Sequence, residues 1–399
     1  MSAEALKASM RVAVLAGLLV LLAGCLGPVS LHHAVLGYDR TVAQIEQEML
    51  LLNIARLRHR HPLHFTVTSS IAATFDYRTS ITAGGVYNAT PGLFAPTFTL
   101  GAMAAENPTL SIVPIQGREF TERVLTPVHE GVFEFFVFQG SPIDMVMRLL
   151  VDGIEVQTAE GRFDRFMLNW PSRPTEYEEF RRVALHLAWL NANRKLFVGR
   201  LSFTETVRAG LRGPPPADEI RTAMEKDYRW RQVPGTDLYE LGRRVTGRVV
   251  ITNYDPRGMT DAARAELNTL ASGNPASFVL IDIRSEHPGG DWPLFGALKL
   301  RSFNRILEFV AEGGSGVAEF DVAKDSRTGP VESNPSRVLA IEITDSAPSA
   351  EAPHTRYREQ YYTVADTAWD RAAFRLLYQG FQMTVTDVSK VGLPITISK

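Results

Sequence analysis

The chain has 399 residues, of which 45% are apolar and 22% are charged. This ordinary globular composition excludes global disorder, collagen-like repeats and a membrane protein of many spans. The 42 basic and 44 acidic side chains leave a formal net charge of -2, which excludes an overall cationic nucleic-acid binder. The single cysteine excludes an internal disulfide and a thiolate-rich metal site.

An apolar run of eleven residues, 12–22, follows Lys7 and Arg11 near the N-terminus. The run is shorter than the roughly 20 residues that a membrane-spanning helix needs, and it has the length of a signal-peptide core. The sequence therefore predicts a signal peptide here.

The run ends in Leu22-Ala23-Gly24-Cys25, which resembles the lipobox of bacterial lipoproteins. This resemblance implies cleavage before Cys25, a diacylglycerol on its sulfur and an acylated amino terminus. Leu26 stands where an Asp would mark inner-membrane retention in Gram-negative lipoproteins, so the resemblance also implies an anchor in the outer membrane. The alternative is a buried cysteine in an ordinary N-terminal helix.

Helix and strand patterns follow one another irregularly along the rest of the chain, with no repeat of fixed period. The expected segments are a lipoprotein signal peptide at 1–24, a lipidated tether at 25–37, an N-terminal α+β domain at 38–170, a central α+β domain at 171–312, a linker or long loop at 313–336 and a C-terminal β-β-α-β segment at 337–399. The mixture of hairpins and helices favours an α+β fold, with mixed antiparallel strands and packed helices, over an alternating parallel sheet.

Within these segments, capping-box spacing predicts that helices begin at Thr41 and Thr175. The reason is that a Thr side chain can accept a hydrogen bond from the amide three residues further on. Buried strands are predicted at 249–251 and 278–281, with a helix between them.

The segment 71–104 carries the most informative pattern in the interior of the sequence. Apolar and polar residues alternate along two stretches, as they do in strands that bury one face. No charged residue occurs between Arg78 and Glu106, a gap of 27 positions. The candidate membrane-facing residues of this predicted hairpin are Phe75, Tyr77, Ile81, Phe98 and Leu100.

Both stretches are long enough to cross a bilayer, because a transmembrane strand takes about 9–11 residues with an apolar outer face. A single hairpin would leave unpaired backbone groups in lipid, whereas a ring of identical subunits would pair every strand edge. One interpretation is therefore an oligomeric outer-membrane pore. The other is a soluble hairpin with one face on the protein's own core, which has the same period of two.

Three histidines near residue 60 form a candidate metal site. His59, His61 and His64 carry imidazole groups, which suit zinc or copper. However, Pro62 breaks their spacing and no carboxylate lies nearby in the sequence, so we expect no metal there.

Three arginines in the same region are candidates for binding anionic lipid headgroups. Arg56, Arg58 and Arg60 would lie close to the predicted anchor. A solvated helix end explains the same residues, because the helix dipole favours cations at its C-terminus.

No specific catalytic motif stands in the sequence. Gly313-Gly314-Ser315-Gly316 has Val317 where a nucleophile elbow needs glycine, and it lacks the ending of a phosphate loop. We therefore expect no catalytic residues and no cofactor other than the lipid on Cys25. Carboxylates brought together by the fold would leave no local motif, so an enzyme remains an open alternative.

Several short sequence segments also bear on the prediction of a lipoprotein. They are Tyr38-Asp39, Leu51-Leu52-Asn53-Ile54-Ala55-Arg56-Leu57-Arg58, Glu106-Asn107-Pro108-Thr109-Leu110 with Pro114 and Gly117, Gly140-Ser141-Pro142-Ile143-Asp144, and Phe374-Arg375-Leu376-Leu377. Together they resemble a group of uncharacterised proteobacterial outer-membrane lipoproteins, from about residue 37 to the C-terminus. The resemblance implies a lipoprotein and no particular activity.

The sequence combines a predicted lipid anchor with the lack of a specific catalytic motif. This combination predicts a non-enzymatic scaffold or accessory subunit of the cell envelope, with its body facing the periplasm. One alternative is a subunit of an oligomeric outer-membrane pore or secretion channel that uses the 71–104 hairpin. Another is an envelope glycan hydrolase, which would need a carboxylate pair about 5–9.5 Å apart in a cleft. The expected partners are the outer membrane, other envelope proteins and further copies of the chain, but not nucleic acid.

Overall fold

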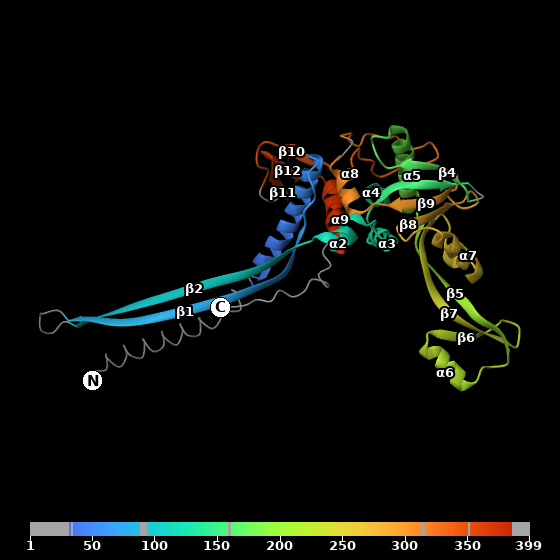
Figure 1. The fold of residues 1–399 in the computed structure, drawn as a ribbon, viewed down its shortest axis with the longest axis horizontal. Coiled ribbons are helices and arrows are strands. Elements are labelled where there is room, and N and C mark those ends of the chain that lie inside the picture. Colours follow the sequence, from blue (N-terminus) through green and yellow to red (C-terminus); the bar gives the residue numbers. More distant parts are fainter. Residues whose placement is uncertain are drawn as a thin grey trace. The chain divides into compact units, whose positions relative to one another are not determined.

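The computed structural model describes residue 32 and residues 35–87, 94–158, 161–312, 316–349 and 352–384, with the backbone alone over 67–113. The chain divides into two compact units. One comprises Met1–Gln47, His64–Ile115 and Val388–Lys399, and the other comprises Glu48–Leu63 and Gln116–Asp387. Helices and mixed, largely antiparallel sheets confirm the predicted α+β fold (Figure 1). The predicted signal peptide and Cys25 lie outside the described residues.

A helix covers the described residues 35–58, so it extends into the predicted tether at 25–37. Thr41 lies inside this helix, and its hydroxyl donates to the carbonyl of Gly37, 2.8 Å away. The predicted helix start at Thr41 is therefore wrong, because a Thr side chain can equally satisfy a carbonyl one turn back. In the second unit the helix buries Leu50, Leu51, Ile54 and Ala55.

The first unit contains one long hairpin of β1 (Thr66–Tyr87) and β2 (Phe94–Pro114). The strands pair antiparallel along their length, with one register shift between Thr68 and Ser70. This confirms a hairpin over 71–104 and extends it, since β1 has 22 residues and β2 has 21.

The second unit is built around a seven-stranded sheet in the order β4-β3-β9-β8-β7-β5, with β6 paired to β7. β7 and β8 run parallel, and the other neighbours are antiparallel. The strands are β3 (Val151–Gln157), β4 (Phe163–Leu168), β5 (Phe197–Arg212), β6 (Tyr228–Gln232), β7 (Leu238–Thr252), β8 (Phe278–Ile283) and β9 (Leu294–Leu300). β3 belongs to the predicted domain at 38–170, and β9 belongs to the predicted domain at 171–312. Because these two strands pair, a single sheet crosses the domain boundary predicted after residue 170.

The second unit also contains helices and short helical turns. They are α2 (Gly117–Phe120), a π-helical turn (Thr121–Leu125), α3 (Glu130–Phe138), α4 (Ile143–Leu150), α5 (Pro174–Ala192), α6 (Ala217–Glu225), a 3₁₀ turn (Pro256–Gly258), α7 (Asp261–Ser272), α8 (Phe303–Val310) and α9 (Ala368–Thr384). The helix predicted from Thr175 is confirmed as α5, which begins one residue earlier because Pro174 takes its first turn, where the fixed φ of proline is favourable.

The crossover β7-α7-β8 confirms the two predicted buried strands and the helix between them. Thr260 caps the N-terminus of α7, and its hydroxyl accepts from the amide of Ala263 at 3.2 Å. Apolar residues of β5, β7, β8 and α7 form one core cluster of Leu201, Phe203, Val250, Leu267, Ala271 and Leu280. Since β7 and β8 are parallel neighbours, their carboxyl ends lie side by side.

Beyond the sheet, β5 and β7 continue as a pair, and β6 and α6 join them there (Figure 1). Residues 205–210 of β5 are exposed in this extension. This part of the extension is therefore accessible to solvent.

The C-terminal part holds a small sheet in the order β10-β12-β11, formed by β10 (Ile341–Thr344), β11 (His354–Tyr357) and β12 (Gln360–Val364). The sequence predicts two strands before the last helix, and the structure has three. Arg358 and Glu359, with φ of 49° and 69°, make the tight turn that joins β11 to β12. Residues 316–336 contain neither helix nor strand, as predicted for a long loop, and the predicted last strand lies outside the described residues.

Candidate functional site

The register of the β1–β2 hairpin brings together the two apolar rows predicted from the sequence. Ile81 is opposite Leu100, and Phe98 is opposite Ala83. Directly opposed residues of an antiparallel pair lie on the same face, and residues two apart in a strand do so as well. The row of Tyr77 and Ile81 in β1 therefore shares one face with the row of Phe98 and Leu100 in β2.

The distal part of the hairpin is uncharged over nine consecutive residue pairs, Thr79–Tyr87 with Phe94–Ala102. The nearest charged residues are Arg78 in β1 and Glu106 in β2, and Glu106 is opposite Phe75. At about 3.4 Å per residue, nine pairs extend about 30 Å, which is the thickness of a bilayer's hydrocarbon core. The uncharged part is thus long enough to cross a membrane.

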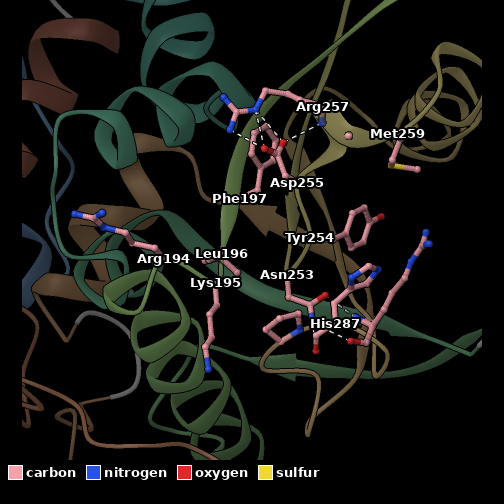
Figure 2. Close-up of a pocket in the computed structure, with 13 residues that line it drawn as sticks. Arg194, Lys195, Leu196, Phe197, Asn253, Tyr254, Asp255, Arg257, Met259 and His287 are labelled. Carbon is pink, nitrogen blue, oxygen red and sulfur yellow. Dashed lines mark hydrogen bonds and ion pairs between the residues drawn. The ribbon is translucent and has the colours of Figure 1, made fainter.

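A pocket of about 620 Å³ lies at the carboxyl ends of β7 and β8 in the second unit (Figure 2). Residues 253–259 follow β7, and Arg284 and His287 follow β8. Residues 194–196 connect α5 to β5, and Phe197 begins β5. The carboxyl ends of neighbouring parallel strands are a common location for ligand sites in α/β units. The crossover therefore makes this pocket a candidate binding site.

Tyr254 makes the central contacts of this pocket. Its hydroxyl donates to Oδ2 of Asp282 at 2.7 Å, and Nε of Arg284 donates to the same oxygen at 2.9 Å. The Arg284 guanidinium lies 4.6 Å from the Tyr254 ring, and the His287 ring centroid lies 4.9 Å from it. Burial and the hydrogen bond to Asp282 raise the pKa of Tyr254 above its ordinary value, so its hydroxyl stays protonated at neutral pH.

The rim of the pocket is cationic. Arg194, Lys195, Arg257 and Arg284 line it together with one carboxylate, Asp255. Arg257 donates to both oxygens of Asp255, from Nε at 2.9 Å and Nη2 at 2.7 Å, and this hydrogen bonding lowers the pKa of Asp255. Figure 2 shows this pair beside the ring of Phe197. The arrangement can hold an anionic group by ion pairing and a planar group by packing against the aromatic rings.

Sequence patterns did not single out Tyr254, Arg257 or Arg284. A usable pattern was present, however, because two predicted buried strands with a helix between them indicate a parallel crossover. The residues that directly follow each strand then lie at one edge of the sheet.

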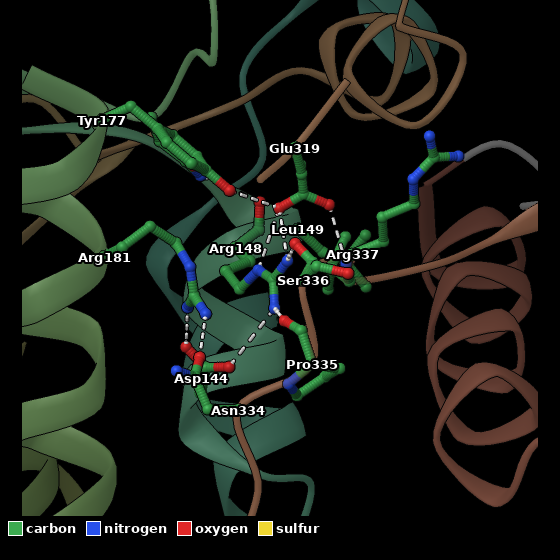
Figure 3. A network of polar contacts seen from close by, with 12 residues as sticks. Asp144, Arg148, Leu149, Tyr177, Arg181, Glu319, Asn334, Pro335, Ser336 and Arg337 are labelled. Atoms are coloured by element: carbon green, nitrogen blue, oxygen red, sulfur yellow. Dashed lines mark hydrogen bonds and ion pairs between the residues drawn. The ribbon is translucent and has the colours of Figure 1, made fainter. Parts of the chain in front are cut away.

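A buried polar network fastens the 316–336 loop to α4 and α5 (Figure 3). Arg148 of α4 is fully buried and donates from Nη2 to Oε1 of Glu319 at 2.6 Å, and Tyr177 of α5 donates its hydroxyl to the same oxygen at 2.8 Å. Burial alone would lower the pKa of Arg148, but the carboxylates of Glu319 and Asp144 outweigh burial and hold that pKa above its ordinary value. The network is closed to solvent, so we assign it to the stability of this unit.

A second buried contact fastens the same loop. His186 of α5 is 2% exposed, with Nδ1 3.1 Å from the hydroxyl of Thr328 and Nε2 3.2 Å from the carbonyl of Gly289. Burial lowers the pKa of His186, so the folded protein holds a neutral imidazole there at neutral pH.

The three arginines predicted to meet lipid headgroups lie at the end of the first helix. Arg58 is 3.4 Å from Glu312, and Arg56 donates to Oδ1 of Asn53 at 3.3 Å. Arg60 is exposed and has a φ of 59°, the left-handed conformation that closes many helices. Headgroup binding by these arginines stays a prediction.

Two of the clustered histidines contact tyrosines of the small C-terminal sheet. Nε2 of His59 is 2.8 Å from the hydroxyl of Tyr362, and Nδ1 of His61 is hydrogen-bonded to the hydroxyl of Tyr357. Burial and the nearby Arg358 lower the pKa of His59. In the part of the chain that the structure describes, no group of three or more His, Cys, Asp or Glu could hold a metal ion.

Of the helices found in the described ranges, none combines the length and apolar character needed to cross a membrane. No protein-family model, curated protein or solved structure matches the chain. The candidate sites therefore rest on geometry and charge alone.

We expect Glu319→Gln to lower the free energy of unfolding by about 3 kcal/mol, because it leaves the buried Arg148 charge without its main partner. Urea unfolding followed by tryptophan fluorescence measures the change. The matched control is Glu179→Gln, whose ion pair with Arg165 joins side chains that are 41% and 49% exposed. The control should cost less than about 1 kcal/mol, and equal losses for the two variants would contradict the structural role of the network.

The buried, neutral His186 predicts an acid-sensitive fold. Below a pH of about 6.5, the unfolded chain binds a proton at this residue that the folded chain resists, so stability falls as the pH decreases from 6.5 to 5. We expect His186→Gln to reduce this loss by up to about 1.4 kcal/mol per pH unit, as measured by urea unfolding at several pH values. A variant as acid-sensitive as the wild type would show that the assignment is wrong.

Proposed function

We propose that this chain is an outer-membrane lipoprotein without catalytic activity of its own, which serves as a subunit of an oligomeric membrane assembly. Each copy contributes the β1–β2 hairpin to that assembly. The observation that carries the proposal is the hairpin register, which unites two apolar rows on one face over a part that is uncharged and about 30 Å long. The lipobox-like Leu22-Ala23-Gly24-Cys25 and the resemblance to proteobacterial lipoproteins support the choice of membrane.

The second face of the uncharged part also supports insertion. It carries mainly small and hydroxyl-bearing residues, namely Ser80, Thr82, Gly84, Thr97, Thr99 and Gly101. A soluble hairpin of this length would ordinarily present charged residues on its solvent face. An apolar face opposite a small, polar and uncharged one is instead the pattern of strands that separate lipid from water.

The need for several copies follows from hydrogen bonding. A two-stranded hairpin leaves one edge of each strand unpaired, and such an edge is not tolerated in hydrocarbon. Hairpins from neighbouring subunits would pair these edges and close a ring around a polar interior. The functional consequence would be a path for polar solutes across the membrane.

A charge in the middle of the proposed lipid face tests the orientation of the hairpin. Phe98, opposite Ala83, is in the fifth of the nine uncharged pairs. An arginine at the midplane of a lipid-facing strand costs about 2–4 kcal/mol, so Phe98→Arg should reduce dye release from protein-loaded vesicles at least about tenfold. Thr99→Arg lies at nearly the same depth on the opposite face and should retain release.

Leu110→Arg is a second control, because Leu110 shares the apolar face, opposite Ile71, but lies outside the uncharged part. It should also retain release. The proposal fails if the wild-type protein releases no dye, or if Phe98→Arg and Thr99→Arg are equally impaired.

A further inference from the structure

An arginine-lined groove of about 1010 Å³ adjoins the pocket of Figure 2 and shares Phe197 and Arg257 with it. The groove lies along the extension of β5, β6 and β7 and the start of α7. The six arginines that line it are Arg200, Arg229, Arg231, Arg244, Arg257 and Arg264, and the three carboxylates are Asp227, Glu240 and Asp261. The chain as a whole has a net charge of -2, so positive charge is concentrated here.

Two of these arginines have no carboxylate partner. The paired ones are Arg200 with Glu134, Arg231 with Glu240, Arg257 with Asp255 and Arg264 with Asp261. Arg244 donates only to a neutral group, the hydroxyl of Ser202, at 2.9 Å. Arg229 has no ion-pair or hydrogen-bond partner among the residues that the structure describes. Both side chains are exposed, so their charge is available to a ligand.

The strand register places these two arginines on one face. Arg229 of β6 is opposite Gly242 of β7, and Arg244 is two residues further along β7. Residues two apart in a strand share a face, so Arg229 and Arg244 start from neighbouring positions. The side chain of Thr204 lies over Gly242 between them, since a Cβ at Gly242 would be only 2.6 Å from Cγ2 of Thr204.

The unpartnered polar groups of the groove are donors. The indole N–H of Trp230 and Nε of Arg264 are buried and have no hydrogen-bond partner among the described residues. A buried donor without an acceptor is costly to the folded state. Groups that only donate select an acceptor, and guanidinium groups favour the oxygens of phosphate and carboxylate.

We propose that this groove binds a ligand carrying two or more phosphate groups, held by Arg229 and Arg244. Two uncompensated cations on one face match two anionic groups, and each phosphate offers several acceptor oxygens to a guanidinium. The carboxylate of Asp227, which also lines the groove, repels anions and so limits the affinity of the groove for phosphate. The phosphates can belong to a soluble molecule or to a lipid headgroup, because the recognising chemistry is the same. This site is independent of the hairpin.

Titration calorimetry of the full chain in detergent with tripolyphosphate tests the proposal. We expect binding that the double variant Arg229→Ala, Arg244→Ala weakens at least about tenfold, since two charge-assisted contacts are lost. Asp227→Asn should tighten binding about twofold or more, because it removes a repulsive charge. The matched control is Arg221→Ala, an exposed arginine of α6 that does not line the groove, and it should bind as the wild type does.

A parallel titration with short-chain cardiolipin, a lipid whose headgroup carries two phosphates, distinguishes the two sources of phosphate. Tighter binding of tripolyphosphate assigns the groove to a soluble ligand, and tighter binding of the lipid assigns it to a headgroup. Absence of binding to both probes would overturn the proposal. Equal weakening by Arg221→Ala and the double variant would overturn it as well, because the effect would then be one of overall charge.

Discussion

A strand in hydrocarbon must have every backbone N–H and C=O group hydrogen-bonded, and this constraint governs what the β1–β2 hairpin can do. Each strand satisfies the other along one edge, while the sheet assignment gives the outer edges no partner among the described strands. In water these groups bond to solvent, but in lipid each unpaired group costs several kcal/mol. Insertion of this hairpin and pairing with hairpins of other copies are therefore one hypothesis rather than two.

The second unit combines a tightly held interior with a cationic edge. Arg148 and Glu319 fix the long 316–336 loop against α4 and α5, so a segment without regular structure is part of the core. The parallel crossover creates the pocket around Tyr254, and the extension of β5 and β7 past the sheet creates the arginine-lined groove. Removing one partner of a buried, paired charge would thus destabilise the unit, whereas recognition would use charges that are exposed and unpaired.

Local patterns predicted much of the fold, and long-range pairing could not be predicted. The α+β class, the hairpin and the buried strands β7 and β8 follow from apolar alternation and continuous apolar runs. The helix start predicted at Thr41 failed because capping-box spacing also occurs inside helices. The ion pair of Arg148 with Glu319 joins residues 171 positions apart, and the groove depends on strand register, so no local sequence pattern reveals either.

The most direct test of the oligomeric hairpin is the mass of the natively processed, full-length protein extracted in mild detergent. Light scattering with the detergent contribution removed measures this mass. The proposed assembly predicts a discrete mass several times that of one chain, which Phe98→Arg reduces and Thr99→Arg preserves. A strict monomer would contradict it and return the apolar face of β1 and β2 to contacts within the protein itself.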